Sequence, residues 1–346
     1  MIVFGRSEIH FYQLSTTRYP AAFAISQPLT TIPDQLYLGV KIDFQLLQKL
    51  CTIPGTSGHE GQLRDFLLEY IKKEQKNWKV KPKLFHGGEF QDCLVMKFGK
   101  PRTALFAHMD TVGFTVRYFN QLVPIGGPDA EEGTKLVGRD SKGEVECALE
   151  YDKENRALYK FGRAIDRGTP LSYKVDFNNS KDFIESAYLD NRLGIYAALK
   201  VAETLAHGVI VFSCWEEHGG GTVPFLAKFI NESWGVRQAV IADITWVTDG
   251  VDHDKGVVIS LRDRNIPRRE FVDRLIALAE KHGVDYQLEV EGTGSSDGGE
   301  LQRSHFPFDW CFVGAPHQHP HTPHEKVSKK DIQSMIQLYH HALKEL

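Results

Sequence analysis

The hydrophobic positions of this chain first follow the spacing of helices. Five apolar residues mark one face of a predicted amphipathic helix: Leu63, Phe66, Leu67, Tyr70 and Ile71. A shorter helix is expected just before it, with Asp43 as a candidate N-cap, and the pair Ser57 and Glu60 resembles a capping box. Residues 1–40 carry prolines among polar and aromatic residues, which predicts irregular structure or an edge strand.

The pattern then changes to that of strands. Two apolar runs, 93–98 and 103–107, predict strands, and the second leads directly into His108. Between residues 114 and 183, short alternating segments are separated by Gly, Asp and Asn turns, and no helical period of useful length occurs. We therefore predict that residues 114–183 form a small all-β domain inserted into the main domain.

After this segment, predicted helices and strands alternate. Helices are expected at 191–206, 223–233, 267–282 and 328–346, and strands at 209–214, 239–244, 285–290 and 309–313. Such alternation is typical of a central mixed sheet that helices cover on both faces. The predicted fold class is α/β, with residues 1–42 as an N-terminal extension and residues 43–113 and 184–346 as the main domain.

Composition and charge narrow the kind of protein. The chain has 346 residues, and its 42% apolar content allows a sizeable core. Its net charge is −4, from 41 basic and 45 acidic residues without a strongly basic block, so we expect no nucleic-acid partner. Five scattered cysteines indicate a reducing compartment, and no run approaches the length of a membrane span. We therefore expect a cytoplasmic protein with no membrane partner.

Candidate chemistry begins at two adjacent carboxylates, Glu216 and Glu217. They follow the apolar run 209–212, which predicts a buried strand, and they precede a glycine-rich turn. Like charges at this distance repel each other and burial penalises each charged form, so a divalent metal beside them would stabilise the pair. Taken alone, the dipeptide also fits a solvated pair at a strand-to-loop exit.

Further candidate ligands lie near other predicted element ends. His108 ends a strand, and Asp110 can hold its ring for metal binding, although a purely structural pair would show the same spacing. Asp190 stands at a helix start, where an N-cap needs no other function, and Asp243 ends a strand. One late loop holds four histidines between which the residues alone do not choose: His317, His319, His321 and His324.

Together these residues predict one site at the carboxyl ends of the strands, where open α/β sheets bind their ligands. Two histidines and three carboxylates suit a pair of hydrolytic divalent metals such as zinc, cobalt or manganese. No thiolate belongs to the set, which argues against a structural zinc site.

The order of six motifs resembles a known family. The motifs, in chain order, are HMDTVG, YLDNRLG, WEEHGGG, IADIT, GTGSSDGG and HTPHE. They resemble the tetrahedral-aminopeptidase (glutamyl aminopeptidase-like) family of two-metal zinc exopeptidases, over roughly residues 43–346. The resemblance implies a zinc-exopeptidase-like fold in which 43–113 and 184–346 form the catalytic metallopeptidase domain and the insert is β-rich.

The resemblance also implies roles for single residues. It implies two divalent metal ions per chain, zinc first, with cobalt or manganese as alternatives. Five residues would be the metal ligands: His108, Asp190, Glu217, Asp243 and His321. Glu216 would be the general base, Asp110 would orient His108, and Asp190 would bridge both metals.

The implied function is that of a metal-dependent aminopeptidase that removes N-terminal residues from short peptides. The family also implies a homo-oligomer, a dimer or a dodecamer built from dimers. A metallo-deacylase or carboxypeptidase of the related zinc-exopeptidase family stays the alternative, because the HMDTV motif resembles that family too. Ser295 and Ser296 before Asp297, and Gln318, depart from the residues common in the family, so the preferred N-terminal residue does not carry over. Asp297 is an extra carboxylate that would suit recognition of a charged α-amine.

Overall fold

The computed structural model describes residues 42–346, so the predicted N-terminal extension lies, apart from its last residue, outside the described residues. The helices are α1 (Gln45–Thr52), α2 (Gly61–Glu74), the 3-10 helix η1 (Gly88–Phe90), α3 (Leu189–Ala202), α4 (Val223–Trp234), α5 (Arg269–His282), α6 (Asp297–Arg303) and α7 (Lys329–Glu345). Within the described residues, no helix combines the length and apolar character needed to cross a membrane.

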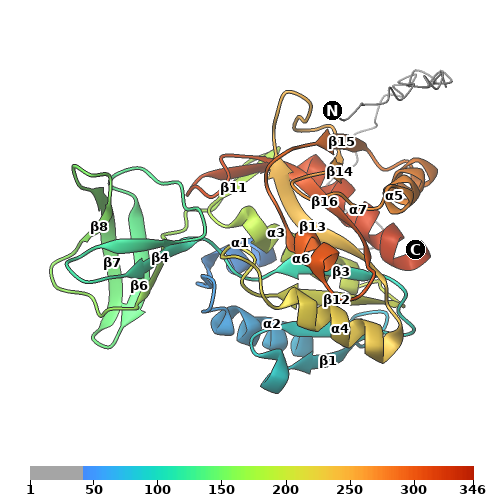
Figure 1. Ribbon diagram of the computed structural model, residues 1–346, viewed down its shortest axis with the longest axis horizontal. Coiled ribbons are helices and arrows are strands. Elements are labelled where there is room, and N and C mark those ends of the chain that lie inside the picture. Colours follow the sequence, from blue (N-terminus) through green and yellow to red (C-terminus); the bar gives the residue numbers. More distant parts are fainter. Residues whose placement is uncertain (1–41) are drawn as a thin grey trace, which may run out of the picture. The chain divides into compact units, whose positions relative to one another are not determined.

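An eleven-stranded mixed sheet forms the centre of the fold (Figure 1). Its strands are β1 (Lys83–His86), β2 (Leu94–Phe98), β3 (Ala104–His108), β10 (Asn178–Asn179), β11 (Phe183–Ser186), β12 (Gly208–Ser213), β13 (Gln238–Trp246), β14 (Val257–Arg262), β15 (Tyr286–Val290), β16 (Asp309–Gln318) and β17 (Glu325–Ser328). Their order is β1-β2-β12-β3-β13-β16-β17-β11-β10, and β14 pairs with both β16 and β15. The central strands β12, β3, β13 and β16 run parallel.

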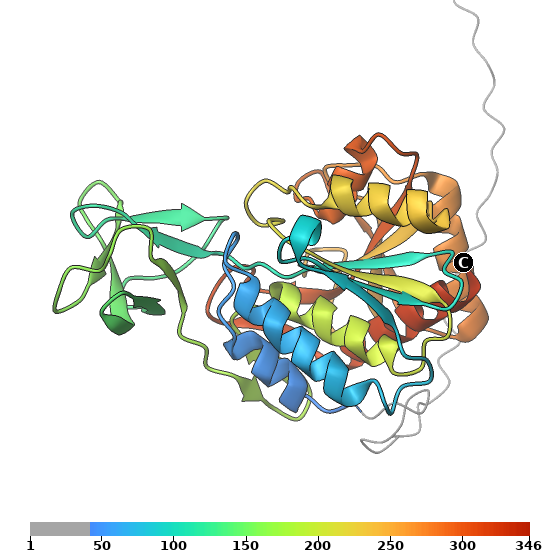
Figure 2. The ribbon, with the colours of Figure 1, turned by 90° about the horizontal axis from the view of Figure 1, so that it is seen from below.

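Helices cover both faces of this sheet, as Figure 2 shows for α3 and α4 on opposite sides. The central strands β3 and β12 are therefore buried at every residue, which explains their continuous apolar runs. Helix α3 contacts β3 and β13 and is itself flanked by α1 and α7. This enclosure explains why α3 is apolar nearly all round instead of on one stripe. The predicted α/β class and the mixed central sheet are confirmed.

A second, six-stranded sheet is antiparallel throughout. Its strands are β4 (Gly113–Val116), β5 (Leu122–Ile125), β6 (Lys135–Asp140), β7 (Gly143–Tyr151), β8 (Ala157–Lys160) and β9 (Pro170–Tyr173), in the order β5-β4-β9-β6-β7-β8. The two edge strands, β5 and β8, approach each other. The Tyr159 amide of β8 donates to the carbonyl oxygen of Asn120, just before β5, at 2.9 Å, so the sheet curls toward a closed barrel. The sheet has a hydrophobic cluster of its own, which includes Phe114, Leu136 and Leu171.

The predicted insert, residues 114–183, contains strands and no helix. However, β10 and the first residue of β11 fall inside this range and pair in the larger sheet. The described residues, 42–346, fall in a single compact unit, and the predicted domain boundaries stay a prediction. All five cysteines are buried and none forms a disulfide, but the cytoplasmic location also stays a prediction.

One predicted capping contact, the Ser57 and Glu60 pair before α2, is wrong, and Ser57 instead contacts the functional site. The Ser57 hydroxyl does not cap α2, because it donates to Asp110 Oδ2 at 2.7 Å. The Glu60 carboxylate instead accepts from the Gly58 amide at 3.0 Å. The Ser57 hydroxyl therefore binds the buried carboxylate of Asp110, which is distant in the sequence, instead of a backbone amide of α2. The predicted capping role of Asp43 is confirmed, because its Oδ1 accepts from the Gln45 amide at the start of α1 at 2.9 Å, although Phe44 is the residue directly before the helix.

Candidate active site

His108 and Asp243 lie where strands β3 and β13 separate. The two strands are paired only as far as Phe106 and Ile241. Beyond this point, His108 Nε2 lies 3.6 Å from Asp243 Oδ2. The prediction that Asp243 ends its strand is wrong, because β16 pairs with β13 along its whole length and holds it extended to Trp246. The gap at the carboxyl end of β3 is nevertheless the expected place for a site in a parallel sheet.

Asp190 reaches the same gap from the start of α3. Its Oδ1 lies 3.1 Å from His108 Nε2, and its Oδ2 lies 3.5 Å from His321 Nε2. Asp190 is not the N-cap of the helix; the side chain of Asn191 accepts from the Gly194 amide at 2.9 Å instead. A Cβ at Gly194 would lie 2.8 Å from the Ala242 carbonyl oxygen, so glycine is needed for α3 to approach β13 here. The Asp190 carboxylate is thereby free to serve the site.

Glu216 and Glu217 occupy a turn that Asp110 holds in place. Asp110 accepts from both backbone amides, with Oδ1 at 3.0 Å from the Glu216 nitrogen and Oδ2 at 3.0 Å from the Glu217 nitrogen. Asp110 Oδ1 also lies 3.5 Å from His108 Nδ1, while the Asp110 backbone oxygen is nearer to that nitrogen, at 3.2 Å. The Glu217 side chain is only 4% exposed, and its Oε2 lies 3.4 Å from His321 Nε2. The solvated reading of the Glu-Glu pair is therefore wrong for Glu217.

Of the four late histidines, His321 is the one whose ring faces the carboxylates of Asp190 and Glu217. Its Nδ1 lies 3.0 Å from the Gly127 carbonyl oxygen, so its Nε2 is directed at Asp190 and Glu217. His317 is used differently: its Nδ1 lies 2.7 Å from the Thr245 carbonyl oxygen, and burial lowers its pKa to about 4. This choice required the tertiary structure, because the four histidines lie within one short stretch of the sequence.

Two groups of possible metal ligands share Asp190. One consists of His108, Asp190 and Asp243, the other of Asp190, Glu217 and His321, and within each group the ligand atoms all lie within 4.8 Å of one another. Glu217 Oε1 is buried without a hydrogen-bond partner in the described part of the chain, as expected of an oxygen that a cation would satisfy. These donors, imidazoles and carboxylates without thiolate, fit two divalent ions. We call these five residues the ligand group.

The carboxylates of the ligand group are like charges in a buried place. Burial raises the pKa of Glu217 well above its usual range, and the charge of Asp190 raises it further. Burial, again with Asp190, also raises the pKa of Asp243 to about 6. Burial acts in the same direction on Asp190, but hydrogen bonds with His108 and His321 outweigh it and hold the Asp190 pKa below its ordinary value. Divalent cations would stabilise the charged forms of all three.

Two buried charged residues fix the backbone around the ligand group. Glu325, which is 1% exposed, accepts from the Asp190 amide at 2.9 Å and from the His321 amide at 3.1 Å. Arg192 is fully buried and donates to the carbonyl oxygens of Met109 and Ile53. Sequence reasoning assigned no role to either residue. The available signal was the HTPHE motif, in which Glu325 follows His321 by four residues.

The segment that follows β5 also touches the ligand group. The Gly127 carbonyl oxygen contacts His321 Nδ1, and the Gly126 amide donates to His218 Nδ1 at 3.1 Å. The Tyr173 hydroxyl, from β9, donates to the His321 carbonyl oxygen at 2.9 Å. Residues of the predicted insert therefore help to orient a ligand, a role that the sequence did not indicate.

A cavity of about 230 Å³ opens onto the ligand group and Glu216. Three further carboxylates line it, Asp263, Glu289 and Glu291, so that seven carboxylates but no Lys or Arg face this space. Sequence reasoning missed these three and expected Asp297 instead. Asp297 does not line the cavity: it is 2% exposed and accepts from the Ser213 hydroxyl. The rest of the lining is Gly127, Ile244, Thr245, Trp246, Thr293, Gly294, Ser295 and Phe312, without Gln318.

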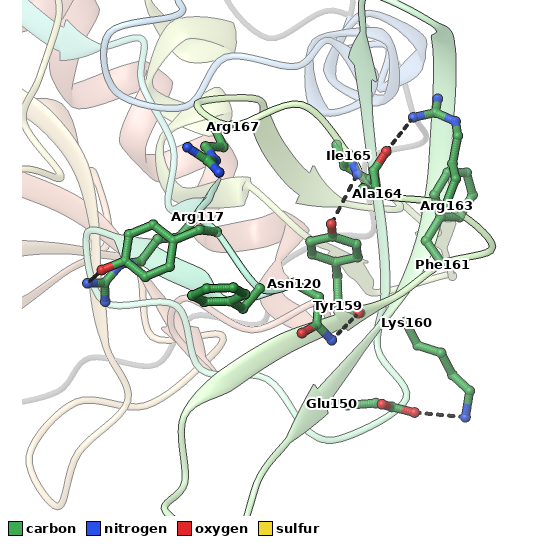
Figure 3. Close-up of a pocket in the computed structure, with 12 residues that line it drawn as sticks. Arg117, Asn120, Glu150, Tyr159, Lys160, Phe161, Arg163, Ala164, Ile165 and Arg167 are labelled. Carbon is green, nitrogen blue, oxygen red and sulfur yellow. Dashed lines mark hydrogen bonds and ion pairs between the residues drawn. The ribbon is translucent and has the colours of Figure 1, made fainter.

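Two other features of the described chain lack this combination. Near the end of α7, His282, His341 and Glu345 form a third group of possible ligands, but the Lys281 ammonium lies 2.6 Å from Glu345 and already balances its charge. A cavity of about 520 Å³ lies in the six-stranded sheet (Figure 3). Its lining residues belong to none of the possible ligand groups found among residues 42–346.

Comparisons with known proteins found chains of similar sequence and similar fold. A lysyl aminopeptidase of Pyrococcus furiosus is 25% identical, over 88% of this chain and 98% of that protein. An aminopeptidase of the archaeon Desulfurococcus kamchatkensis shares the fold, with a TM-score of 0.77 at 19% identity, over 88% of this chain and 94% of the other. The TET1 peptidase of Pyrococcus horikoshii, which assembles into a tetrahedron or a large octahedral shell, has a TM-score of 0.73 at 22% identity, over 88% of this chain and 99% of the other.

The family model of the M42 glutamyl aminopeptidases matches residues 153–338, more than half of the chain. That range includes four of the five residues of the ligand group and both glutamates of the turn after β12. The chain therefore belongs to the M42 glutamyl aminopeptidase family, and it is a peptidase, a hydrolase that acts on peptide bonds.

Proposed function

We propose that the protein is a metal-dependent aminopeptidase that removes N-terminal residues from short peptides with two divalent ions, zinc first. The observation that carries this proposal is the sharing of Asp190 between two groups of possible ligands. One carboxylate with an oxygen toward each histidine is the arrangement that two closely spaced ions require. His108 and Asp243 would hold one ion, and Glu217 and His321 the other.

Glu216 is the residue of the cavity best placed to move a proton. It lines the cavity beside the ligand group without belonging to either group of possible ligands. Its carboxylate would accept the proton of the attacking water and then deliver it to the nitrogen of the leaving amine. When bound, the two ions would lower the pKa of that water and stabilise the developing oxyanion. Burial raises the pKa of Glu216, which suits a group that takes up a proton and returns it.

The charge of the cavity favours an aminopeptidase over the alternative functions. A carboxypeptidase must bind the α-carboxylate of its substrate, and a cationic side chain is the usual partner. Neither Lys nor Arg lines this cavity. An excess of carboxylates instead suits a charged α-amine, which an N-acylated substrate of a deacylase lacks. Restriction to the first residue of the peptide would follow from this recognition.

Matched substrates test the proposal. The purified protein would be assayed with leucyl anilide, its N-acetylated form, and a short peptide whose C-terminus is amidated. We expect hydrolysis of the first and third but not of the second, loss of activity with a chelator, and recovery with zinc, cobalt or manganese. Faster hydrolysis of the acetylated anilide would instead identify a deacylase. Activity that survives complete metal removal would contradict the metal-dependent mechanism.

We also propose that the six-stranded sheet takes part in homo-oligomer formation. The loop between β4 and β5 carries Phe119, 82% exposed, and Tyr118, 39% exposed, beside the cavity of Figure 3. Exposed neighbouring aromatic residues of this kind favour a contact with a second copy. Deletion of residues 114–183 would be a poor test of this role. Gly127 and Tyr173 contact His321, so the deletion would also disturb the ligand group. Light scattering of Phe119→Ser should show a smaller particle than Ile266→Ser, a change at a residue 60% exposed and outside this sheet, and equal masses would contradict this role.

A further inference from the structure

Three carboxylates of the cavity are not explained by metal binding. Asp263, Glu289 and Glu291 line the same space as the ligand group, but none of them belongs to a group of possible metal ligands. Asp263 is 7% exposed and Glu289 is 3% exposed. Burying a charged group without a partner is costly, so a protein keeps such residues where a partner or a ligand compensates them. We call these three residues the acidic pocket.

The partners of the acidic pocket within the chain are neutral. Glu289 accepts from the Thr245 hydroxyl, and Asp263 accepts from the Asn265 side-chain amide at 3.2 Å. Arg262 precedes Asp263 in the chain, but its Nε donates to the Asp263 backbone carbonyl oxygen at 3.1 Å instead of the carboxylate. Burial raises the pKa of Asp263, although hydrogen bonds with Asn265 and the charge of Arg262 act against this rise. None of the three carboxylates forms an ion pair within residues 42–346.

Apolar side chains complete the walls of the same space. Ile244, Trp246 and Phe312 line the cavity together with the acidic pocket. Trp246 is 38% exposed, and its ring lies 3.6 Å from the position that a Cβ at Gly294 would take. An aliphatic chain that ends in a cation fits such a space, because its methylenes cover apolar walls while its charged end reaches carboxylates.

The cavity as a whole also has an excess of negative charge, which favours the binding of a cation. Seven carboxylates line it, and two divalent ions with the α-ammonium of a substrate would offset five of them. A neutral side chain on the substrate would leave the acidic pocket without a partner, and an acidic one would be repelled. A lysine or arginine side chain would supply one of the two positive charges that are still missing.

We propose that Asp263, Glu289 and Glu291 receive the side chain of the substrate's N-terminal residue, and that this residue is basic. The inference rests on the proposed aminopeptidase function, and it adds the class of residue removed. Glutamate, the residue in the family's description, is then among the poorest substrates of this chain. The distinction between lysine and arginine lies in the length and shape of the pocket and is part of the test.

Four aminoacyl anilides separate charge from size in the zinc-loaded protein: lysyl, norleucyl, leucyl and glutamyl, with arginyl added for comparison. Lysine and norleucine have the same chain length and differ by the terminal ammonium. We expect kcat/KM for lysyl or arginyl anilide to exceed that for norleucyl anilide at least about tenfold, and glutamyl anilide to be at least about 100-fold poorer than lysyl. Equal values for lysyl and norleucyl anilide would overturn the inference but leave the aminopeptidase function intact. Failure to cleave any of them would overturn both.

Variants assign the preference to the acidic pocket. Glu291→Gln is the first choice because Glu291 is partly exposed and is the least needed for folding, and Asp263→Asn is the second. In each, the ratio of kcat/KM for lysyl over norleucyl anilide should fall about tenfold, whereas the exposed control Glu232→Gln should keep the ratio of the unmodified protein. The charge reversal Glu291→Lys should move glutamyl anilide ahead of lysyl anilide. An unchanged ratio in both neutral variants would exclude the acidic pocket as the origin of the preference.

Discussion

The ligand group and the acidic pocket line one cavity, yet their carboxylates are arranged in different ways. Asp190, Glu217 and Asp243 each lie within 3.6 Å of a histidine nitrogen, and Asp190 faces two of them. The carboxylates of the acidic pocket meet only hydroxyl, amide or solvent neighbours. Proximity to imidazole therefore separates carboxylates suited to metal binding from carboxylates left for substrate.

The difference also shows how one acidic cavity can serve two purposes. Buried like charges are stable only when each has its own compensating charge. In the ligand group that compensation would come from bound ions, and in the acidic pocket from a side chain that arrives and leaves with each substrate. Four predictions test this division, in order of the expected effect.

The largest effect is expected from Asp190→Ala. Because one carboxylate serves both groups of ligands, its loss should remove both ions and lower turnover by more than about 10⁴-fold. The matched control is Asp263→Asn, which should keep two ions because Asp263 belongs to no ligand group. Elemental analysis of both proteins gives the answer directly. Two metal ions per chain in Asp190→Ala would contradict the bridging role.

The two adjacent glutamates should respond differently to the same substitution. Glu216→Gln should keep its metal but lose about 10²–10⁴-fold in turnover, as expected for a missing general base. Glu217→Gln should instead bind metal more weakly, because Glu217 Oε2 lies beside His321 Nε2. Metal titration followed by single-substrate kinetics distinguishes the two. The reverse pattern would exchange their roles.

His317 is buried in the core, four residues before His321 of the ligand group. Its pKa in the folded protein is about 4 because burial disfavours the charged imidazole, whereas the pKa of a histidine in the unfolded chain is near its ordinary value of 6.5. Stability from this residue is therefore fully present above pH 6.5 and is lost as the pH falls through 4. The total change is about 3 kcal/mol.

His317→Asn, which keeps a donor near the Thr245 carbonyl oxygen, should show a flatter decline of the unfolding free energy between pH 6.5 and 4. Urea unfolding of the metal-free protein at several pH values measures the slope. The exposed residue His305 offers a control, since His305→Asn should keep the slope of the unmodified protein. Identical slopes for His317→Asn and the unmodified protein would place His317 outside the core.

The smallest effect is expected from Glu325→Gln. Glu325 holds the backbone amides of Asp190 and His321, and a glutamine can accept only one of these two hydrogen bonds with its single carbonyl oxygen. Metal affinity should fall about 10–100-fold, as is common when a residue that supports a metal ligand is lost. Glu291→Gln is the counterpart from the acidic pocket, and its metal affinity should not change. Equal losses in both would remove the distinction between the two regions.

Local pattern accounts for much of the fold. The amphipathic spacing from Leu63 to Ile71 predicted α2, and the apolar run before Ser213 predicted β12, because these elements bury the face or faces that their sequence marks. The sequence predicted less of the structure where contacts between distant residues replace local ones. Ser57 was predicted to cap a helix but bonds to Asp110, and β13 extends beyond Asp243 because β16 pairs with it.

The sequence by itself determined the family, through the order of its motifs, and the kinds of residue that would bind metal. Only the tertiary structure showed which of the four histidines faces the other ligands, namely His321. It also showed that Asn191, and not Asp190, caps the helix, and that Asp263, Glu289 and Glu291 line the cavity. The physical reason is that motifs record residues close together in the chain. In the acidic pocket, Asp263 follows the end of β14, whereas Glu289 and Glu291 lie in and just after β15, so their charges meet only because β14 and β15 pair in the folded sheet.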